Sequence, residues 1–169
     1  MDDIAAEADI TKPVLYAHFG DKAGLATALS ERFGADLVPE VLGAFSKEIA
    51  ATEMVREAID TFIAWVEREP ELYRFLVRGV AGGTSSFVEQ NLVAALGTQL
   101  AQILRTGLRN AGTDSGPAEV WSFSILAAVF AGAEWWLERQ TMSRTDLVDY
   151  LANLVWTGAS QAALGTPAS

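Results

Sequence analysis

Hydrophobic residues recur at intervals of three and four positions along the whole chain, and this spacing predicts amphipathic helices. We find no alternating strand pattern bounded by hairpin turns, no repeat and no low-complexity segment. The sequence therefore predicts an all-α protein. We expect helices over 2–8, 11–19, 22–45, 52–68, from 70 to the glycines at 79, 82 and 83, from 86 to the loop at 111–117, and over 117–139 and 144–164.

Residues that favour helix ends support several of these boundaries. Thr11 and Asp21 are suitable N-caps, and Gly20 between them is suited to ending a helix. Ser143, with an acidic residue three positions later, has the spacing of a capping interaction. Pro39 lies inside the 22–45 pattern, where it predicts either a kink or the end of the helix.

One predicted helix, 117–139, lacks a polar face, because its segment VWSFSILAAVFAGAEWW is apolar on every side. Such a helix must be covered all round. Either a partner subunit supplies part of the cover, or the helix is the centre of a monomeric bundle. We expect a homodimer formed by the last two helices, with Ala128 and Gly132, one turn apart, near the seam where helices approach closely.

Composition narrows the classes of function. The chain has 169 residues, 50% of them hydrophobic, and contains one His and no Cys. Disulfides, thiolate nucleophiles, His-rich metal sites and a Ser-His-Asp arrangement in the larger region are thereby excluded, so we expect no enzyme, no metal and no cofactor. Neither a signal peptide nor an uninterrupted apolar stretch of ~18 residues is found, which predicts a cytoplasmic protein without a membrane segment.

The segment 10–22, ITKPVLYAHFGDK, has little apolar content for a packed helix. Ile10, Leu15 and Phe19 form only a narrow inward stripe, and the polar and aromatic side chains point elsewhere. This outward face is suited to contact with another molecule. The net charge of −10 argues against a broad nucleic-acid surface, and residues 1–33 carry three basic against six acidic residues. A small, locally basic site remains possible if its acids face away.

The segment MDDIAAEADITKPVLYAHFGDKAGLATAL resembles the helix-turn-helix of the TetR family of bacterial transcriptional regulators. The matching elements are Ile4-Ala5, the turn 8–11, Tyr16-x-x-Phe19, and Lys22 with Leu25. Asp9 stands where the family most often has Gly, and Asp tolerates left-handed geometry there. The family has a further helix before the position where this chain begins. The resemblance therefore implies a truncated domain, in which Ile4, Ala8, Leu15 and Phe19 lose part of their cover.

The resemblance assigns roles on DNA to seven residues. A recognition helix in the major groove needs short side chains at its N-terminus for base edges, and polar groups for phosphates. Lys12 would donate to guanine, whereas Pro13, Val14 and the Thr11 methyl would touch a thymine methyl. Tyr16, His18 and Lys22 would contact phosphates. Without the resemblance, Tyr16 and His18 could be ordinary surface residues and Lys22 an ordinary surface lysine.

The remaining helices look like the family's ligand-binding and dimerisation domain. We expect domains at 1–45 and 46–169. Candidate ligand-binding residues are mostly aromatic: Phe62, Trp65, Tyr73, Phe87, Trp121, Phe130 and Glu134. Aromatics suit an apolar or aromatic ligand, but they are also common in a plain core, and Glu134 could instead be exposed or form a salt bridge.

The resemblance implies a ligand-responsive regulator, expected to be a repressor that binds operator DNA as a dimer and is released by its ligand. The alternative is a small-molecule-binding or interaction protein of the same fold that binds no DNA. It would need only the bundle, and it would tolerate the missing helix.

Overall fold

The computed structural model describes the backbone of residues 1–78 and 85–165, and the side chains of 1–29, 31–75 and 93–161. Within these ranges every regular element is helical, so the predicted all-α class is confirmed. The elements are α1 (Asp2–Glu7), α2 (Lys12–Phe19), α3 (Lys22–Gly43), the 3-10 turn η1 (Ala44–Ser46), α4 (Ala51–Arg68), α5 (Pro70–Arg78), α6 (Ser85–Asn110), α7 (Ala118–Arg139) and α8 (Arg144–Gly165).

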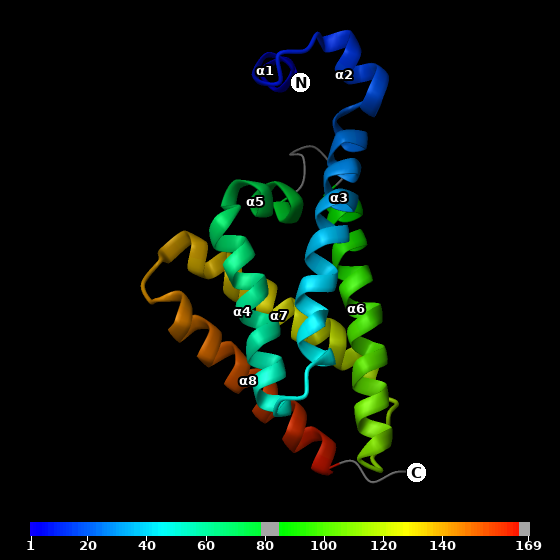
Figure 1. Ribbon diagram of the computed structural model, residues 1–169, viewed down its shortest axis with the longest axis vertical. Helices are drawn as coiled ribbons and strands as arrows, with labels where there is room; N and C mark the ends of the chain where they lie inside the picture. The colour runs from blue at the N-terminus through cyan, green and yellow to red at the C-terminus, as the bar shows by residue number, and fades with distance from the viewer. Residues whose placement is uncertain (79–84, 166–169) are drawn as a thin grey trace.

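The molecule is elongated, with α1 and α2 at one end and the helical bundle at the other (Figure 1). The long helix α3 connects the two and packs beside α6 in the bundle. α6 packs on α7, and α4 packs on α8. The small N-terminal end therefore reaches the bundle chiefly through α3.

Two of the expected helix caps form as predicted. The Asp21 carboxylate accepts a hydrogen bond from the Gly24 amide at 2.8 Å, which begins α3. The Ser143 hydroxyl accepts one from the Asp146 amide at 3.1 Å and begins α8. Thr11 occupies the N-cap position of α2 with extended backbone, but its side chain makes no capping hydrogen bond.

Pro39 neither ends α3 nor shortens it, because the helix continues to Gly43. The expected end of the helix at this residue is therefore not seen. Pro39 lies at an exposed position late in the helix. The chain leaves the helical path only after η1, where residues 47–50 lead into α4.

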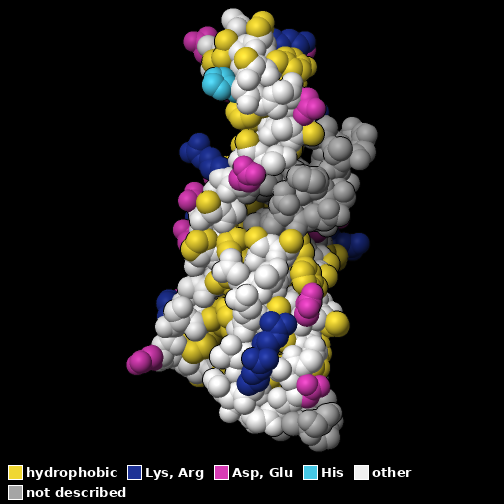
Figure 2. Space-filling model, turned by 90° about the vertical axis from the view of Figure 1, so that its right-hand side faces the viewer, with side chains coloured by type: hydrophobic (Ala, Val, Ile, Leu, Met, Phe, Trp, Pro, Cys, Tyr) yellow, Lys and Arg dark blue, Asp and Glu magenta, His cyan; other side chains and the backbone are white. Residues whose placement is uncertain are grey.

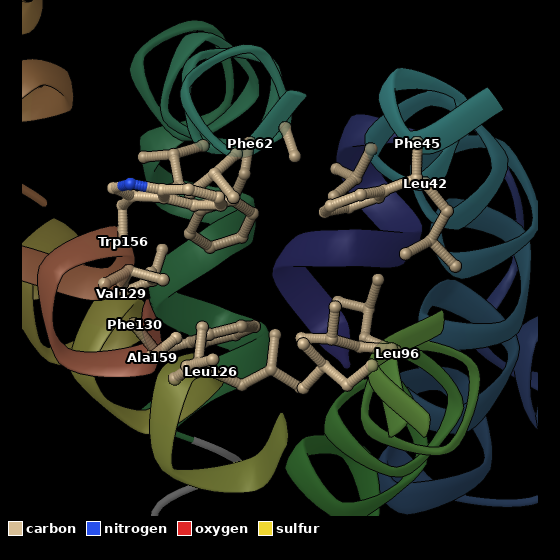
Figure 3. A pocket seen from close by; sticks show the side chains of 17 residues that line it. Leu42, Phe45, Phe62, Leu96, Leu126, Val129, Phe130, Trp156 and Ala159 are labelled. Carbon is tan, nitrogen blue, oxygen red and sulfur yellow. The ribbon is translucent and has the colours of Figure 1, made fainter. Parts of the chain in front are cut away.

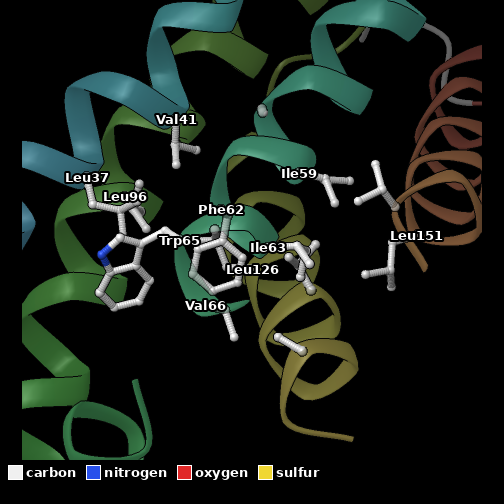
Figure 4. Close-up of a cluster of buried hydrophobic side chains, with 14 of the residues drawn as sticks. Leu37, Val41, Ile59, Phe62, Ile63, Trp65, Val66, Leu96, Leu126 and Leu151 are labelled. Atoms are coloured by element: carbon white, nitrogen blue, oxygen red, sulfur yellow. The ribbon is translucent and has the colours of Figure 1, made fainter. Parts of the chain in front are cut away.

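The core of the bundle forms around α4 (Figure 4). Ile59, Phe62, Ile63 and Val66, which share one face of the helix at three- and four-residue spacing, are all buried, and Ile63 and Val66 have no exposed surface. Full burial of one such side chain contributes roughly 1.5–3 kcal/mol of transfer free energy. At the surface, Arg56 of α4 donates to the Asp149 carboxylate of α8 at 2.8 Å, and this hydrogen bond raises the pKa of Arg56.

The helices α1 and α2 bury much less. Ala5 and Leu15 are their only buried side chains, whereas Ile4 is 37% and Ile10 is 39% exposed. The predicted inward position of Ile10 is therefore wrong. The exposure of Ile4 and Ala8 agrees with the expected loss of cover, because α1 packs on α2 and no further described helix covers them, whereas Leu15 keeps its cover. Figure 2 shows hydrophobic side chains at the surface of this narrow end.

α7, the helix without a polar face, is covered on one side only. It packs on α6 and α8, but Val120, Phe123 and Trp135 are between 37% and 68% exposed. Gly132 lies against the chain's own α8, where an added Cβ would be 3.0 Å from Leu151 Cδ2. The close helix approach that we expected at a dimer seam thus occurs, at Gly132, within one chain.

Among the described residues α7 alone is long and apolar enough to cross a membrane, with a mean hydropathy of 1.4 in its most apolar window. Core helices of soluble bundles meet the same criterion. α7 packs with α4, α6 and α8, so this single helix is weak evidence for a membrane protein.

Candidate DNA-binding end and apolar cavity

The turn between α1 and α2 adopts the geometry that a helix-turn-helix requires. Asp9 has a φ of +52°, in the left-handed region where Gly is the easiest residue and Asp is tolerated. The Ile10 amide then donates to the Ala5 carbonyl oxygen at 3.0 Å, which closes the turn. The Asp in place of the family's usual Gly is therefore accommodated without loss of the turn.

The seven residues assigned to DNA all lie on the exposed surface of α2 and its two ends. They are Thr11, Lys12, Pro13, Val14, Tyr16, His18 and Lys22. Val14 and Tyr16 are 44% and 41% exposed, so both side chains are accessible to a partner. Lys22 is the first residue of α3, where the helix dipole also favours an anion.

Lys12 has a partner that the sequence did not reveal. Its ammonium group lies 2.8 Å and 3.0 Å from the two carboxylate oxygens of Asp2 in α1. The hydrogen bond and the charge of Lys12 lower the pKa of Asp2, and the same contact raises the pKa of Lys12. Both side chains are exposed, so the pair is weak and solvent competes for it.

The bundle contains a cavity of about 120 Å³ with walls from α3, η1, α4, α6, α7 and α8. All seventeen lining residues are apolar. In Figure 3, Phe62, Phe130 and Trp156 approach the empty space from one side, and Leu42, Phe45 and Leu96 approach it from the other. Such a cavity excludes water and accepts hydrocarbon.

The structure divides the predicted ligand-binding residues among several places. Phe62 and Phe130 line the cavity, with ring centroids 4.7 Å apart. Tyr73 lies outside the wall, buried, and its hydroxyl donates to the Phe130 carbonyl oxygen at 2.9 Å. It therefore supports the wall from behind.

Three of the other four predicted residues do not line this cavity. Trp65 is buried at a separate hollow between α3 and α4, and the half-buried Glu134 lies outside the cavity wall. Trp121 lines a second hollow, described below. Phe87 lies outside the residues whose side chains are described.

Aliphatic residues form most of the wall and were missed as candidates. α6 contributes Leu96, Leu100 and Leu104, whose four-residue spacing correctly predicts an inward stripe. That spacing is the same whether a side chain faces another side chain or an empty space. α8 contributes Val155 and Trp156, from a helix that we had assigned only to dimerisation.

The second hollow is a groove of about 210 Å³ between α7 and α8. Trp121, Ser124 and Ala128 form its α7 side, and Leu154 and Gly158 form part of its α8 side. Ser124 is the only polar side chain among its lining residues. The groove is more open than the cavity, and Leu154 beside it is 63% exposed.

Comparison with known proteins agrees with both ends of this architecture. Residues 1–29 match the family model described as bacterial regulatory proteins of the tetR family, and residues 41–167 match the tetracyclin repressor-like C-terminal domain. The chain belongs to the TetR family of bacterial transcriptional regulators. Members of this family are transcriptional regulators and not enzymes, in agreement with the prediction from composition.

Two curated TetR-like regulators illustrate the relationship. An uncharacterized HTH-type transcriptional regulator of Mycobacterium tuberculosis is 34% identical over 160 residues, covering 93% of this chain and 67% of that protein. The HTH-type transcriptional activator FasR of Mycolicibacterium smegmatis is 25% identical over 170 residues, covering 97% of this chain and 75% of FasR.

Solved TetR-like structures share the fold. The fatty acid degradation regulator FadR of Bacillus halodurans superposes with a TM-score of 0.78 at 13% identity, over 93% of this chain and 87% of FadR. A TetR-like regulator from Rhodococcus sp. RHA1 superposes with a TM-score of 0.70 at 24% identity, over 94% of this chain and 83% of that protein. At these identities the likeness concerns the fold alone.

Proposed function

We propose that this TetR-family regulator is a cytoplasmic repressor that binds operator DNA as a homodimer and is released by a small apolar ligand. One observation carries the proposal. α3 begins with Lys22 at the DNA-binding end, and its other end supplies Val41 and Leu42 to the cavity wall. A ligand that repacks the cavity therefore acts directly on the helix that holds the recognition helix.

On DNA, α2 enters the major groove with Thr11, Lys12, Pro13 and Val14 at base edges. Tyr16, His18 and Lys22 bind phosphates. The exposure of all seven side chains supports this arrangement. Lys12 must leave Asp2 to reach a base, and because this ion pair is exposed, the exchange costs little free energy.

The proposed homodimer forms through the outer faces of α7 and α8. These faces expose Val120 and Phe123 of α7, and Tyr150 and Leu154 of α8, between 37% and 68%. Apolar side chains gathered on adjacent helices are typical of an interface with another protein. A second copy would give α7 the cover that its sequence requires on every side.

The ligand is apolar because the indole N–H of Trp156 is the only polar group that the described side chains of the cavity wall carry. A polar group enclosed there would lose its water without gaining a hydrogen bond. The wall is mainly aliphatic, whereas the ligand-binding residues expected from the sequence were aromatic and acidic. It therefore suits a hydrocarbon group.

The test combines DNA selection with salt titration. Sites selected from a random duplex library are measured by fluorescence anisotropy at several salt concentrations, with sedimentation velocity to give the stoichiometry. A repressor dimer should bind two half-sites ~34–36 Å apart, with affinity that falls steeply as salt rises.

The alternative, a protein that binds a ligand but no DNA, is favoured by the net charge of −10 and by the neutralisation of Lys12 by Asp2. It predicts that no sequence is enriched and that any residual DNA binding lacks sequence preference. FasR is named an activator, so the same titration must also be made with ligand present. A ligand that strengthens DNA binding would overturn the proposed release by ligand. The assignment as a ligand-responsive regulator would remain.

A further inference from the structure

The apolar cavity is too small to be the whole ligand site. Its volume of about 120 Å³ is below the ~150 Å³ of an apolar cavity that stays dry and accepts benzene. Sites for typical small molecules occupy ~300–1,000 Å³. Whatever enters this cavity is therefore one end of a ligand, and the remainder must lie elsewhere.

The groove between α7 and α8 is the adjoining space. Ile125 of α7 and Val155 and Ala159 of α8 line both hollows, so side chains rather than backbone separate them. Ile125 and Val155 are half-buried, and their rotamers can change without breaking a helix hydrogen bond. Cavity and groove together reach the lower end of the volume range for small-molecule sites.

The walls also define the shape of the ligand. Seventeen described residues from five helices and η1 line a small volume, and the groove adjoins it on the α7–α8 side, so the two spaces lie one after the other and not in one round chamber. Every one of these side chains is apolar, and Ser124 at the groove is the first polar side chain outside the cavity. A bulky ring system would fill such a space poorly, whereas a chain of methylene groups fits it.

We infer that cavity and groove form one ligand site with two compartments, which binds an unbranched hydrocarbon chain. The end of the chain occupies the inner cavity, its next segment passes Ile125, and its polar end lies in the groove at Ser124 or in solvent. This inference rests on the proposed function only in that the bundle binds a ligand. It requires neither DNA binding nor the repressor role.

The groove also lies on the face that the proposed dimer buries. Leu154 lines it and is 63% exposed in the single chain. A second copy packed on α7 and α8 would cover the outer part of the ligand. Long chains, which reach the groove, should therefore shift the monomer–dimer equilibrium, and chains confined to the inner cavity should not.

The probes are the straight-chain alcohols hexanol, octanol, decanol and dodecanol, with cyclodecanol as a compact molecule of equal carbon number. Binding is followed by calorimetry and by tryptophan fluorescence, since Trp156 lines the cavity and Trp121 lines the groove. In the unmodified chain, affinity should rise roughly fourfold per methylene along the series. Decanol should bind with much higher affinity than cyclodecanol.

Gly158→Leu fills the groove, and Gly107→Leu on α6 is its control, because both glycines are helical, exposed and have no atom within 4 Å of an added Cβ. Gly158→Leu should leave hexanol affinity unchanged and stop the increase beyond octanol, whereas Gly107→Leu should follow the unmodified chain. Ala58→Val, which narrows the inner cavity, should weaken all four alcohols.

Sedimentation without ligand first checks that Gly158→Leu leaves the oligomeric state unchanged. If Gly158→Leu changes the oligomeric state, Ser124→Leu replaces it as the groove-filling variant, because Ser124 lines the groove from α7. Its affinity should likewise stop increasing beyond octanol. Equal chain-length profiles for the groove-filling variant and Gly107→Leu would overturn the two-compartment site. Cyclodecanol binding as tightly as decanol would overturn the unbranched chain. If the unmodified chain binds no alcohol but still binds selected DNA, this inference and the proposed apolar ligand are both refuted. The proposed DNA-binding function would not be affected by that result.

Discussion

The bundle and the DNA-binding end use their hydrophobic residues in opposite ways. In the bundle, Ile63 and Val66 have no exposed surface and lie in one continuous core. At the other end, only Ala5 and Leu15 are buried, and Val14 and Tyr16 are more than 40% exposed. One chain thus combines a region that is stable through packing with a region whose side chains face outward.

This difference concerns stability as well as shape. α1 packs on α2, and α2 packs on α3, so few buried contacts hold the DNA-binding end. Regions with few buried contacts open locally at a lower free energy than the core does. We therefore expect the DNA-binding end to unfold before the bundle, and we expect variants in the two regions to act on different transitions.

The largest effect is expected from Ile63→Ala in the bundle. Removing these buried carbons should lower the free energy of unfolding by ~2–5 kcal/mol, measured by urea denaturation with circular dichroism. Ile49→Ala is the matched control, because Ile49 is 38% exposed and lies outside the proposed dimer face, and its effect should be about 0.5 kcal/mol or less. Equal effects from both would mean that the buried core described here does not form.

Leu15→Ala tests whether the DNA-binding end is a separate unit. Leu15 is 2% exposed, and its loss should abolish DNA binding and amide protection in α1 and α2 while the melting temperature of the bundle stays unchanged. Hydrogen exchange combined with calorimetry measures both. If Leu15→Ala lowers the melting temperature of the bundle as much as Ile63→Ala does, the two regions unfold as one cooperative unit and are not separate.

Lys12→Ala and Lys22→Ala should affect DNA binding in different ways. In the proposed arrangement Lys22 binds a phosphate, so Lys22→Ala should weaken all sequences about equally and reduce the salt slope by roughly one unit. Lys12→Ala should cost ~1–3 kcal/mol at one base position and relax the preference there. Sequence-independent losses from both variants would remove Lys12 from the base-reading residues.

The smallest effect is expected from Asp2→Asn, which releases Lys12. DNA affinity should rise and the salt slope should steepen by at most about one unit, because one more cation is available to the DNA. The melting temperature should not change, since the pair is exposed. Anisotropy titration against the unmodified chain measures this, and weaker DNA binding would mean that Asp2 positions Lys12 instead of competing for it.

The pH dependence of this ion pair has a defined sign. The folded pKa of Asp2 lies below its ordinary value of 3.8, because Lys12 donates a hydrogen bond to it. Its contribution to stability is therefore present above pH 3.8 and is lost as the pH falls through the lower folded value. At neutral pH the pair stays fully charged, so Asp2→Asn and not acidification is the useful test.

Periodicity and capping predicted most of the fold. The Asp21 and Ser143 caps and the α4 stripe from Ile59 to Val66 depend on neighbours within one or two turns, so the sequence contains them directly. Ile10 was predicted to face inward and does not, and Leu15 was predicted to lose cover and is buried. Their burial depends on which helix covers them, and local spacing does not contain that information.

The site was predictable in part for the same reason. The exposed face of α2 followed from the small apolar stripe and from the family resemblance, whereas the Lys12–Asp2 pair required the angle between α1 and α2. Phe62 and Phe130, two of the candidate residues, lie together in the cavity wall, and their ligand-binding role stays a prediction. The aliphatic wall from α6 and the contribution of Trp156 were missed, because empty space leaves no trace in a residue pattern.

The length of α3 also determines how small a movement at the cavity is sufficient to displace the recognition helix. Its 22 residues span about 33 Å at roughly 1.5 Å per residue. Pivoting near Val41 by about 5° would displace its first turn by roughly 2.5 Å, enough to misplace base contacts that operate over hydrogen-bond distances. Under the proposed function, the length of this one helix would turn a small side-chain rearrangement at the cavity into the difference between bound and released DNA.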